Sequence, residues 1–347
     1  MGKHAAIISG EIKRAQAEWA ELGKTHDVLF WGNRTRDQLI ADLPKLAAQK
    51  KYDAIAFMPG GGWQGAVDQE LLGAFEGHGL RYINGMGAGY DHVDLDWVTN
   101  KLGAYFINNP GAVSHPTATT TTILILECIR WTSQMEGRTR RGEWKFGLGL
   151  SPDPRDVVVG IIGLGTIGKI VRDQIQGFGT KVVYTQRHKL PESDEKGATF
   201  LPFDELIATA DVISLLTPLT PETFHLIGEK EIAKMKKGVM IVNTSRGKGV
   251  IVCSKSALCL RATTVLDEHA LVAALQSGHV DRVGLDVYEN EPYPHPYLLT
   301  TEKATVFPHN GSGTQRVIRD GELEILGNIR TWLETGTAPN AVNSPAA

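Results

Sequence analysis

The sequence predicts an α/β protein built from two Rossmann-like, doubly wound parallel-sheet domains. At 347 residues the chain is longer than one hydrophobic core usually serves, since domains average about 150 residues. Short apolar runs also alternate with polar helical stretches, which is typical of βα units around a parallel sheet. The alternation occurs twice, first as HAAIIS, DVLFWG, YDAIAFMP and LRYING, and again from Asp156 as DVVVGIIG, KVVYT, DVISLL, GVMIVN, DRVGLDV and ATVFP.

Two longer apolar segments indicate how the domains are connected. The segment from Thr117 to Trp131 is too long for a strand and lacks proline, so we expect a buried linking helix. The segment from Gly313 to Glu334 has apolar residues at roughly helical spacing and would return the chain to the first domain. We therefore predict a first domain of residues 1–113 and 315–347 and a second domain of residues 114–314. A ligand is expected in the cleft between them.

Composition excludes several classes of protein. The chain has 36 basic and 39 acidic side chains, and a net charge of -3 does not favour nucleic-acid binding. Cys128, Cys253 and Cys259 form no CxxC pair, so neither a disulfide framework nor a metal site is predicted. No run approaches the ~18 apolar residues of a membrane span, and no signal peptide is evident. We expect a cytoplasmic protein.

The sharpest motif is GLGTIG, which follows the apolar run VVVGII and precedes a helical stretch. Gly163 would allow a tight turn, Gly165 would let a pyrophosphate approach the backbone, and Gly168 would let the helix pack on the strand. The amides of Thr166 and Ile167 would then face the anion at the helix N-terminus. No Lys-Ser or Lys-Thr pair follows, which excludes a P-loop. The motif predicts that residues 114–314 form a dinucleotide-binding domain, which leaves residues 1–113 and 315–347 as the substrate domain.

The choice of dinucleotide is predicted from the next strand, which ends in YTQRHK. An enzyme that uses NAD would place Asp or Glu there, and this chain has neither. Arg187, with His188 and Lys189, suits the 2′-phosphate of NADP. We expect NADP(H) to be preferred, with NAD(H) as a weaker alternative. The other interpretation is a solvated basic loop.

A second glycine cluster, Gly85-Met86-Gly87-Ala88-Gly89, also follows an apolar run. It has no third glycine at the offset of a dinucleotide motif. It is either an ordinary tight turn or a backbone nest whose amides hold a small carboxylate.

Three further segments place polar residues directly after apolar strands: NTSRG, GLDVYENEP and FPHNGSG. The carboxyl ends of the strands line the ligand crevice in an open α/β sheet. Singly, Arg246, Glu291 and His309 would be ordinary surface residues. Together they could form a site. Arg246 provides a planar donor for a carboxylate and a carbonyl, His309 provides an acid/base group, and Glu291 provides a carboxylate that orients it.

The chain resembles the D-isomer-specific 2-hydroxyacid dehydrogenase family over nearly its whole length. The resemblance lies in the ordered motifs GAGYDHVDLD, NNPGAVSHPTA, GIIGLGTIGK, LTPLTPETFHLIG, MKKGVMIVNTSRG, DEHALVAALQSGHV, GLDVYENEP and PHNGSG. It implies that Arg246 binds the substrate, Glu291 pairs with the histidine and His309 donates the proton. It also implies substrate contacts from the amides of Ala88 and Gly89.

The resemblance extends to the cofactor groove and the activity. It implies cofactor contacts from Thr217, Pro218, Ser245, Asp286 and Gly311, with Asp286 beside the nicotinamide. The expected reaction is reduction of a small 2-keto acid (glyoxylate, hydroxypyruvate or a related acid) to the D-2-hydroxy acid by a homodimer. The YTQRHK loop resembles the glyoxylate/hydroxypyruvate reductase branch.

Two alternatives remain. One is a dinucleotide-sensing scaffold without significant turnover, because similar corepressors keep the Arg, Glu and His residues. The other, formate oxidation, is less favoured because that branch carries an amide where this chain has Glu291.

Two departures from the family pattern stand out. Thr119 occupies a position in the linking helix where the family usually has an acidic residue. In addition, 19 residues separate Gly247 from Asp267, whereas βα loops usually take about 2 to 6. We interpret residues 249–264 as an insertion that lies outside the sheet and is dispensable.

Overall fold

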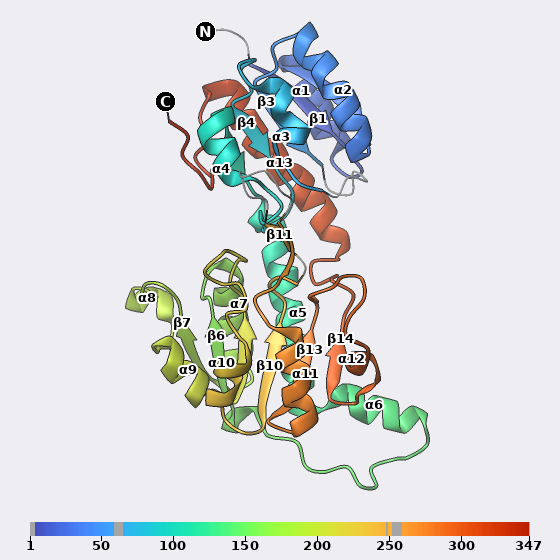
Figure 1. The fold of residues 1–347 in the computed structure, drawn as a ribbon, viewed down its shortest axis with the longest axis vertical. Helices are drawn as coiled ribbons and strands as arrows, with labels where there is room; N and C mark the ends of the chain where they lie inside the picture. Colours follow the sequence, from blue (N-terminus) through green and yellow to red (C-terminus); the bar gives the residue numbers. More distant parts are fainter. Residues whose placement is uncertain (1–3, 59–64, 248, 252–258, 347) are drawn as a thin grey trace. The chain divides into compact units, whose positions relative to one another are not determined.

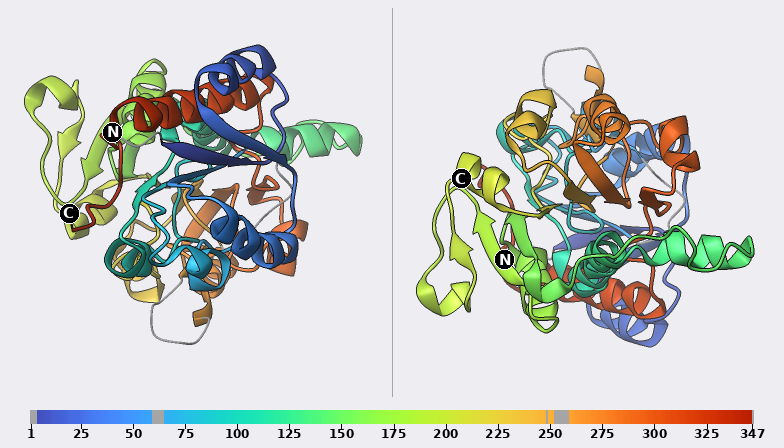
Figure 2. Two further views of the ribbon diagram at one scale, coloured as in Figure 1. Left: turned by 90° about the horizontal axis from the view of Figure 1, so that it is seen from above. Right: turned by 90° about the horizontal axis from the view of Figure 1, so that it is seen from below.

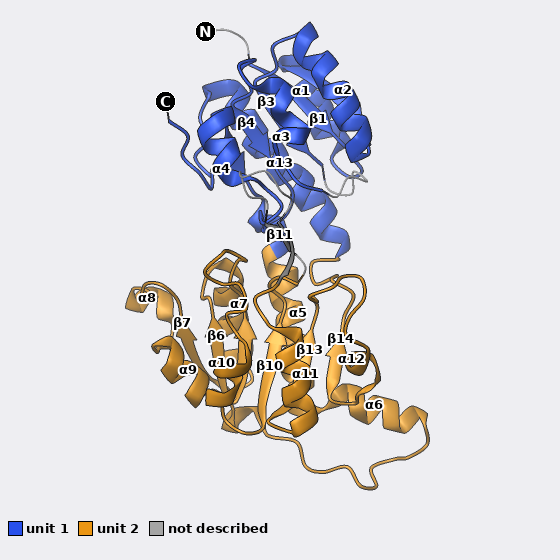
Figure 3. Ribbon diagram, viewed as in Figure 1, with its two compact units in different colours: residues 1–113, 250–261, 314–347 blue, residues 114–249, 262–313 orange. Residues whose placement is uncertain are grey.

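A computed structural model describes residues 4–58, 65–247, 249–251 and 259–346 (Figure 1). The chain divides into two compact units, which Figure 3 distinguishes by colour. Unit 1 comprises Met1–Val113, Val250–Arg261 and Thr314–Ala347, and unit 2 comprises Ser114–Gly249 and Ala262–Gly313.

Unit 1 contains a five-stranded parallel sheet in the order β2-β1-β3-β4-β5. Alternate residues of its strands point to opposite faces, so Ile7 and Ile8 belong to different cores. Helices α1 and α13 lie side by side on one face (Figure 2), and α2, α3 and α4 cover the other. The strands are β1 (Ala5–Ser9), β2 (Asp27–Gly32), β3 (Ala54–Phe57), β4 (Tyr82–Asn84) and β5 (Tyr105–Ile107), and the helices are α1 (Gln16–Thr25), α2 (Arg36–Gln49), α3 (Gln69–Leu72), α4 (Leu95–Trp97) and α13 (Gln315–Thr335), with short turns η1 (Gly73–Phe75) and η2 (Val98–Leu102).

Unit 2 contains a seven-stranded parallel sheet in the order β14-β13-β10-β9-β6-β7-β8. The strand order reverses between β6 and β9, where doubly wound sheets bind their ligands. Helices α5 and α7 pack on one face, and α9 to α12 pack on the other. The strands are β6 (Val158–Ile162), β7 (Lys181–Thr185), β8 (Thr199–Phe200), β9 (Val212–Leu215), β10 (Val239–Asn243), β13 (Val280–Leu285) and β14 (Ala304–Val306), and the helices are α7 (Thr166–Gln176), α8 (Glu192–Glu195), α9 (Phe203–Thr209), α10 (Glu229–Lys234), α11 (Glu268–Ser277) and α12 (Pro296–Thr300), with the turn η3 (Pro154–Asp156).

These two sheets confirm the predicted fold class. The linking helix α5 (Pro110–Arg130) starts earlier than the predicted Thr117 and includes Pro116. The carboxylate of Glu324 on α13 accepts the amides of the two residues that follow Pro110, each at 2.9 Å. Those amides have no partner within the helix, so the carboxylate stabilises this earlier start.

The predicted insertion does not join the seven-stranded sheet. Strands β11 (Gly249–Ile251) and β12 (Cys259–Thr263) pair with each other in a separate two-stranded sheet, and 250–261 is assigned to unit 1 rather than to unit 2. Cys253 and the rest of 252–258 lie outside the described residues.

Thr264 corrects the predicted end of the insertion. It is 2% exposed, its hydroxyl donates to the carbonyl of Arg246 at 3.2 Å, and its carbonyl accepts the amide of His225 at 2.8 Å. Thr264 is therefore part of the framework of unit 2. Over the residues that the structure describes, no helix is both long and apolar enough to cross a membrane.

Candidate active site

The turn after β6 shows why its glycines are needed. Gly163 has a φ of 101°, in the region that favours glycine, and a Cβ there would lie 2.8 Å from the carbonyl oxygen of Leu216. A Cβ on Gly168 would lie 2.3 Å from the carbonyl oxygen of Gly163. A Cβ on Gly165 would meet nothing within 4 Å. The first and last glycines thus permit packing within the chain, whereas Gly165 has space beside it for a ligand.

The surroundings of this turn fit a dinucleotide phosphate. Helix α7 starts after Gly165 without a side-chain cap, so the amides of Thr166 and Ile167 lie at an uncapped helix N-terminus. Thr217 follows β9, and its buried hydroxyl has no partner among the residues that the structure describes. Pro218 beside it is exposed. An unpartnered hydroxyl next to an uncapped helix suits a polar ligand.

The basic loop after β7 is open to solvent. Arg187, His188 and Lys189 are all exposed, and Gln186 donates to the carbonyl of His188 at 2.7 Å. Lys189 lies 3.8 Å from a carboxylate oxygen of Glu195. The Arg187 side chain thus remains on the surface at the end of β7.

His309 and Glu291 form a hydrogen-bonded pair. His309 follows β14 and Glu291 follows β13, and the His309 Nδ1 lies 2.7 Å from the Glu291 Oε2. The pKa of His309 is raised above its usual 6.5 by the hydrogen bond to Glu291, against the opposing effects of burial and of the positive charge of Arg246. The side chain of His309 is 46% exposed. The pair thus favours a protonated imidazolium whose Nε2 is left to meet a ligand.

The turn that carries His309 is held by a buried carboxylate. His309 has a φ of 50°, and the two oxygens of Asp286 accept the amides of Asn310 at 2.9 Å and Gly311 at 2.8 Å. Asp286 is 2% exposed, and burial raises its pKa against these hydrogen bonds. A Cβ on Gly311 would lie 2.6 Å from Asp286. Both Asp286 and Gly311, expected to contact the cofactor, thus also fix the backbone beside His309.

Arg246 lies in the turn after β10. Its Nη1 donates to the carbonyl of Ser245 at 2.9 Å, and its charge acts on His309. The amide and hydroxyl of Ser245 both donate to the Asn243 Oδ1, at 3.0 and 2.7 Å. Ser245 is buried, so its side chain stabilises the turn from which Arg246 extends.

Gly247 brings the Arg246 loop against the Glu291 loop. A Cβ on Gly247 would lie 2.1 Å from the carbonyl oxygen of Tyr288 and 2.7 Å from the Glu291 Oε1. No other residue fits at this approach. The contacts of Gly247 and Tyr288 were not predicted from the sequence, although NTSRG and GLDVYENEP contain both. Arg246, Glu291 and His309 thus come together at the carboxyl ends of β10, β13 and β14.

The second glycine cluster belongs to unit 1. Gly87 has a φ of 67°, and its carbonyl accepts the amide of Asn109 at 2.7 Å. The carbonyl of Ala88 accepts the side chain of Asn108 at 2.7 Å. Within the part of the chain that the structure describes, the amides of Ala88 and Gly89 have no acceptor. The carbonyls of this loop thus accept hydrogen bonds within the protein, whereas these two amides remain available for an anion.

Known proteins resemble this chain over nearly its full length. Residues 122–259 and 261–311 match the family described as D-isomer specific 2-hydroxyacid dehydrogenase, NAD binding domain. A 4-methyl-2-oxopentanoate reductase A from Aspergillus oryzae is 36% identical over 336 residues, which is 96% of this chain and 95% of the relative. A glyoxylate reductase from Thermococcus litoralis is 35% identical over 290 residues, 80% of each chain.

Solved structures agree with these relatives. A glyoxylate reductase from Paecilomyes thermophila has a TM-score of 0.85 at 36% identity, covering 99% of both chains. The holo form of D-mandelate dehydrogenase from Rhodotorula graminis has a TM-score of 0.86 at 27% identity, covering 100% of this chain and 99% of that one. Together with the dinucleotide turn and the paired His309 and Glu291, these matches show that the chain belongs to the D-isomer-specific 2-hydroxyacid dehydrogenase family, as an NAD(P)-dependent oxidoreductase.

Proposed function

We propose that this enzyme reduces a small 2-keto acid, such as glyoxylate, hydroxypyruvate or a branched or aromatic relative, to the D-2-hydroxy acid. The observation that carries the proposal is the 2.7 Å pair of His309 and Glu291, with the charge of Arg246 nearby. This arrangement supplies a proton donor and a carboxylate-binding cation in one place. The names of the similar proteins support the same reaction class.

Each residue has a proposed task. The nicotinamide cofactor, when bound, supplies the hydride. Arg246 binds the carboxylate of the keto acid and polarises its carbonyl, and the amides of Ala88 and Gly89 also bind the carboxylate. His309 donates the proton from Nε2 as the carbonyl oxygen becomes an alkoxide, and Glu291 keeps the imidazole charged and oriented.

The choice of keto acid is tested by turnover. Purified protein would be supplied with glyoxylate, hydroxypyruvate, 4-methyl-2-oxopentanoate or phenylglyoxylate, each with NADPH and with NADH, and followed by absorbance. We expect oxidation of the cofactor with at least one acid, and a D-configured product. Tight NADPH binding without turnover of any acid would instead favour the dinucleotide-sensing scaffold.

We also propose that NADPH is preferred over NADH, because the exposed Arg187 stands where an NAD enzyme would carry a carboxylate. Arg187→Gln should weaken NADPH much more than NADH, since only NADPH carries the 2′-phosphate. Lys181→Gln, at the opposite end of β7, is the matched control. Equal weakening of both cofactors, or a wild-type preference for NADH, would contradict the proposal.

The homodimer is proposed to form through an arm of unit 2, residues 132–152. Helix α6 (Thr132–Arg140) has no buried residue, and the following loop exposes Trp144 by 62%, Phe146 by 78% and Leu150 by 97%. Several large, exposed apolar side chains in one loop often mark an interaction site. A second copy of the chain is the partner we expect.

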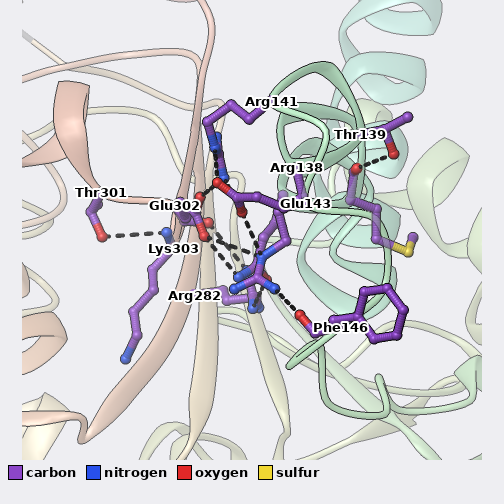
Figure 4. Close-up of polar contacts among 11 residues, drawn as sticks. Arg138, Thr139, Arg141, Glu143, Phe146, Arg282, Thr301, Glu302 and Lys303 are labelled. Carbon is purple, nitrogen blue, oxygen red and sulfur yellow. Dashed lines mark hydrogen bonds and ion pairs between the residues drawn. The ribbon is translucent and has the colours of Figure 1, made fainter.

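Polar contacts hold the base of this arm in place (Figure 4). Arg138 donates to the carbonyl of Phe146 at 3.0 Å, and Arg141 pairs with Glu143 at 2.7 Å and with Glu302. The apolar side chains are therefore presented on an anchored loop. Sedimentation should show a dimer for the wild type and a weakened one for Phe146→Ser with Leu150→Ser. A wild-type monomer at micromolar concentration would contradict the assignment.

A further inference from the structure

Tyr288 hydrogen-bonds to Glu291 and to the end of the strand that leads to His309. It lies just after β13 and is 4% exposed. Its hydroxyl donates to the carbonyl of Phe307 at 2.6 Å, two residues before His309, and lies 3.2 Å from the carbonyl of Leu285. Its backbone amide donates to the Glu291 Oε1 at 3.0 Å. One buried residue thus restrains the strand end that leads to the histidine and the carboxylate that pairs with it.

Packing does not provide this restraint. The side chain of His309 is 46% exposed and that of Glu291 is 22% exposed, so neither is enclosed by a core. The separation of the two groups depends on the two loops that carry them. Asp286 fixes the backbone after His309, and the Tyr288 hydroxyl fixes the backbone before it. Burial raises the pKa of the Tyr288 phenol, which therefore stays an O–H donor.

The Glu291 loop is restrained from its other side by Glu268. This carboxylate is 8% exposed, and its oxygens accept the amides of Glu289 at 2.9 Å and His295 at 2.7 Å. These amides lie on either side of Glu291 in the sequence. Glu268 thus restrains the segment that carries Glu291, and the amide of Tyr288 binds the Glu291 carboxylate at 3.0 Å.

We propose that Tyr288 is a positioning residue for proton donation, and that its hydroxyl sets the distance between His309 and Glu291. The inference rests on the proposed role of His309 as proton donor. Phenylalanine would preserve the buried ring but could not hold the Phe307 carbonyl. The histidine turn would then be free to move relative to Glu291, which would weaken the hydrogen bond that keeps the imidazole charged.

Tyr288→Phe is the test, with Tyr82→Phe as the matched control. Tyr82 is a buried tyrosine of unit 1 whose hydroxyl lies 3.5 Å from Asn84, away from the site. In Tyr288→Phe we expect kcat for keto-acid reduction to fall about tenfold, since misplacing a catalytic group by ~1 Å can cost ~100-fold. The KM for the keto acid and NADPH binding should change little. The alkaline limit of the pH profile of kcat should move to lower pH. Tyr82→Phe should change neither kcat nor this alkaline limit.

A double-mutant cycle distinguishes positioning from general support of the fold. If Tyr288 acts through the pair, Tyr288→Phe should have little further effect on kcat in a Glu291→Gln background. Additive effects, or a fall in kcat without movement of the alkaline limit, would overturn the proposal.

The imidazole of His309 can also be titrated by NMR in the cofactor-free protein, without any turnover. The pKa of His309 should be lower in Tyr288→Phe than in the wild type. An unchanged pKa would overturn the positioning role. A lowered pKa in a protein that reduces no keto acid would leave the restraint supported and refute the proposed function instead.

Discussion

The segments that carry Glu291 and His309 are built very differently from the segment that carries Arg246. Glu291 follows β13 and His309 follows β14, and hydrogen bonds from Asp286, Tyr288 and Glu268 brace these two segments. The chain after β10 instead leads, beyond Gly247, into the predicted insertion, and Thr264 again belongs to the framework of unit 2. Even so, Arg246 is held by contacts from both ends, because Thr264 donates to its carbonyl at 3.2 Å and Asn243 donates to it at 3.5 Å. The main chain that carries a candidate catalytic residue can thus stay in place beside an inserted segment when the residues that flank the insertion remain in contact.

The largest effect is expected from His309, in the braced segment after β14. His309→Gln should lower kcat roughly 1000-fold, because an amide can hydrogen-bond but cannot deliver a proton at neutral pH. NADPH binding, measured by fluorescence, should stay near that of the wild type. His78→Gln, an exposed histidine of unit 1, is the control. Unimpaired turnover would remove His309 as the general acid.

Arg246→Lys is expected to have the next largest effect. An ammonium is a point charge that cannot make the planar two-pronged contact of a guanidinium. Losing one charge-assisted hydrogen bond worth about 1.5–3 kcal/mol would lower kcat/KM about 100-fold, with the fold retained. Arg330→Lys, on the exposed side of α13, should be neutral. A near-normal kcat/KM would show that Arg246 does not bind the substrate.

Gly247→Ala tests the contact between the loop that carries Arg246 and the loop that carries Glu291. The added methyl group would lie 2.1 Å from the Tyr288 carbonyl oxygen, so the loops must separate. A shift of a fraction of an ångström should lower kcat about tenfold. Gly327→Ala in α13, where a Cβ meets nothing within 4 Å, is the control. Equal activity of the two variants would show that the approach of the loops is unimportant for catalysis.

The smallest effect is expected from deleting residues 249–263. The ends left by the deletion are close, because the Thr264 hydroxyl already bonds to the Arg246 carbonyl at 3.2 Å. We expect turnover and melting temperature to be preserved or raised, since a short loop should brace Arg246 at least as well. Removing Thr264 as well should be worse than removing 249–263 alone. Unfolding or inactivation by the shorter deletion would show that the segment is integral.

The sequence predicted both sheets because apolar runs with regular spacing report burial directly. The dinucleotide turn was also predictable, since Gly163 is required by the backbone conformation of the turn and Gly168 by a close contact within it. The earlier start of α5 was missed because it depends on Glu324, which lies far away in the sequence. The roles of Tyr288 and Glu268 were missed for the same reason. Their partners are backbone groups of other loops, and no spacing along the chain reveals such contacts.

The central claim is that Glu291 keeps His309 protonated so that it can donate the proton. The most direct measurement is the pH dependence of kcat for keto-acid reduction in the wild type and in Glu291→Gln. Reduction needs the protonated imidazole, so activity should persist below the raised pKa of His309 and be lost as the pH rises through it. In the wild type this loss should occur above the usual histidine value of 6.5, and in Glu291→Gln it should move to lower pH. Superimposable profiles for the two proteins would contradict the account.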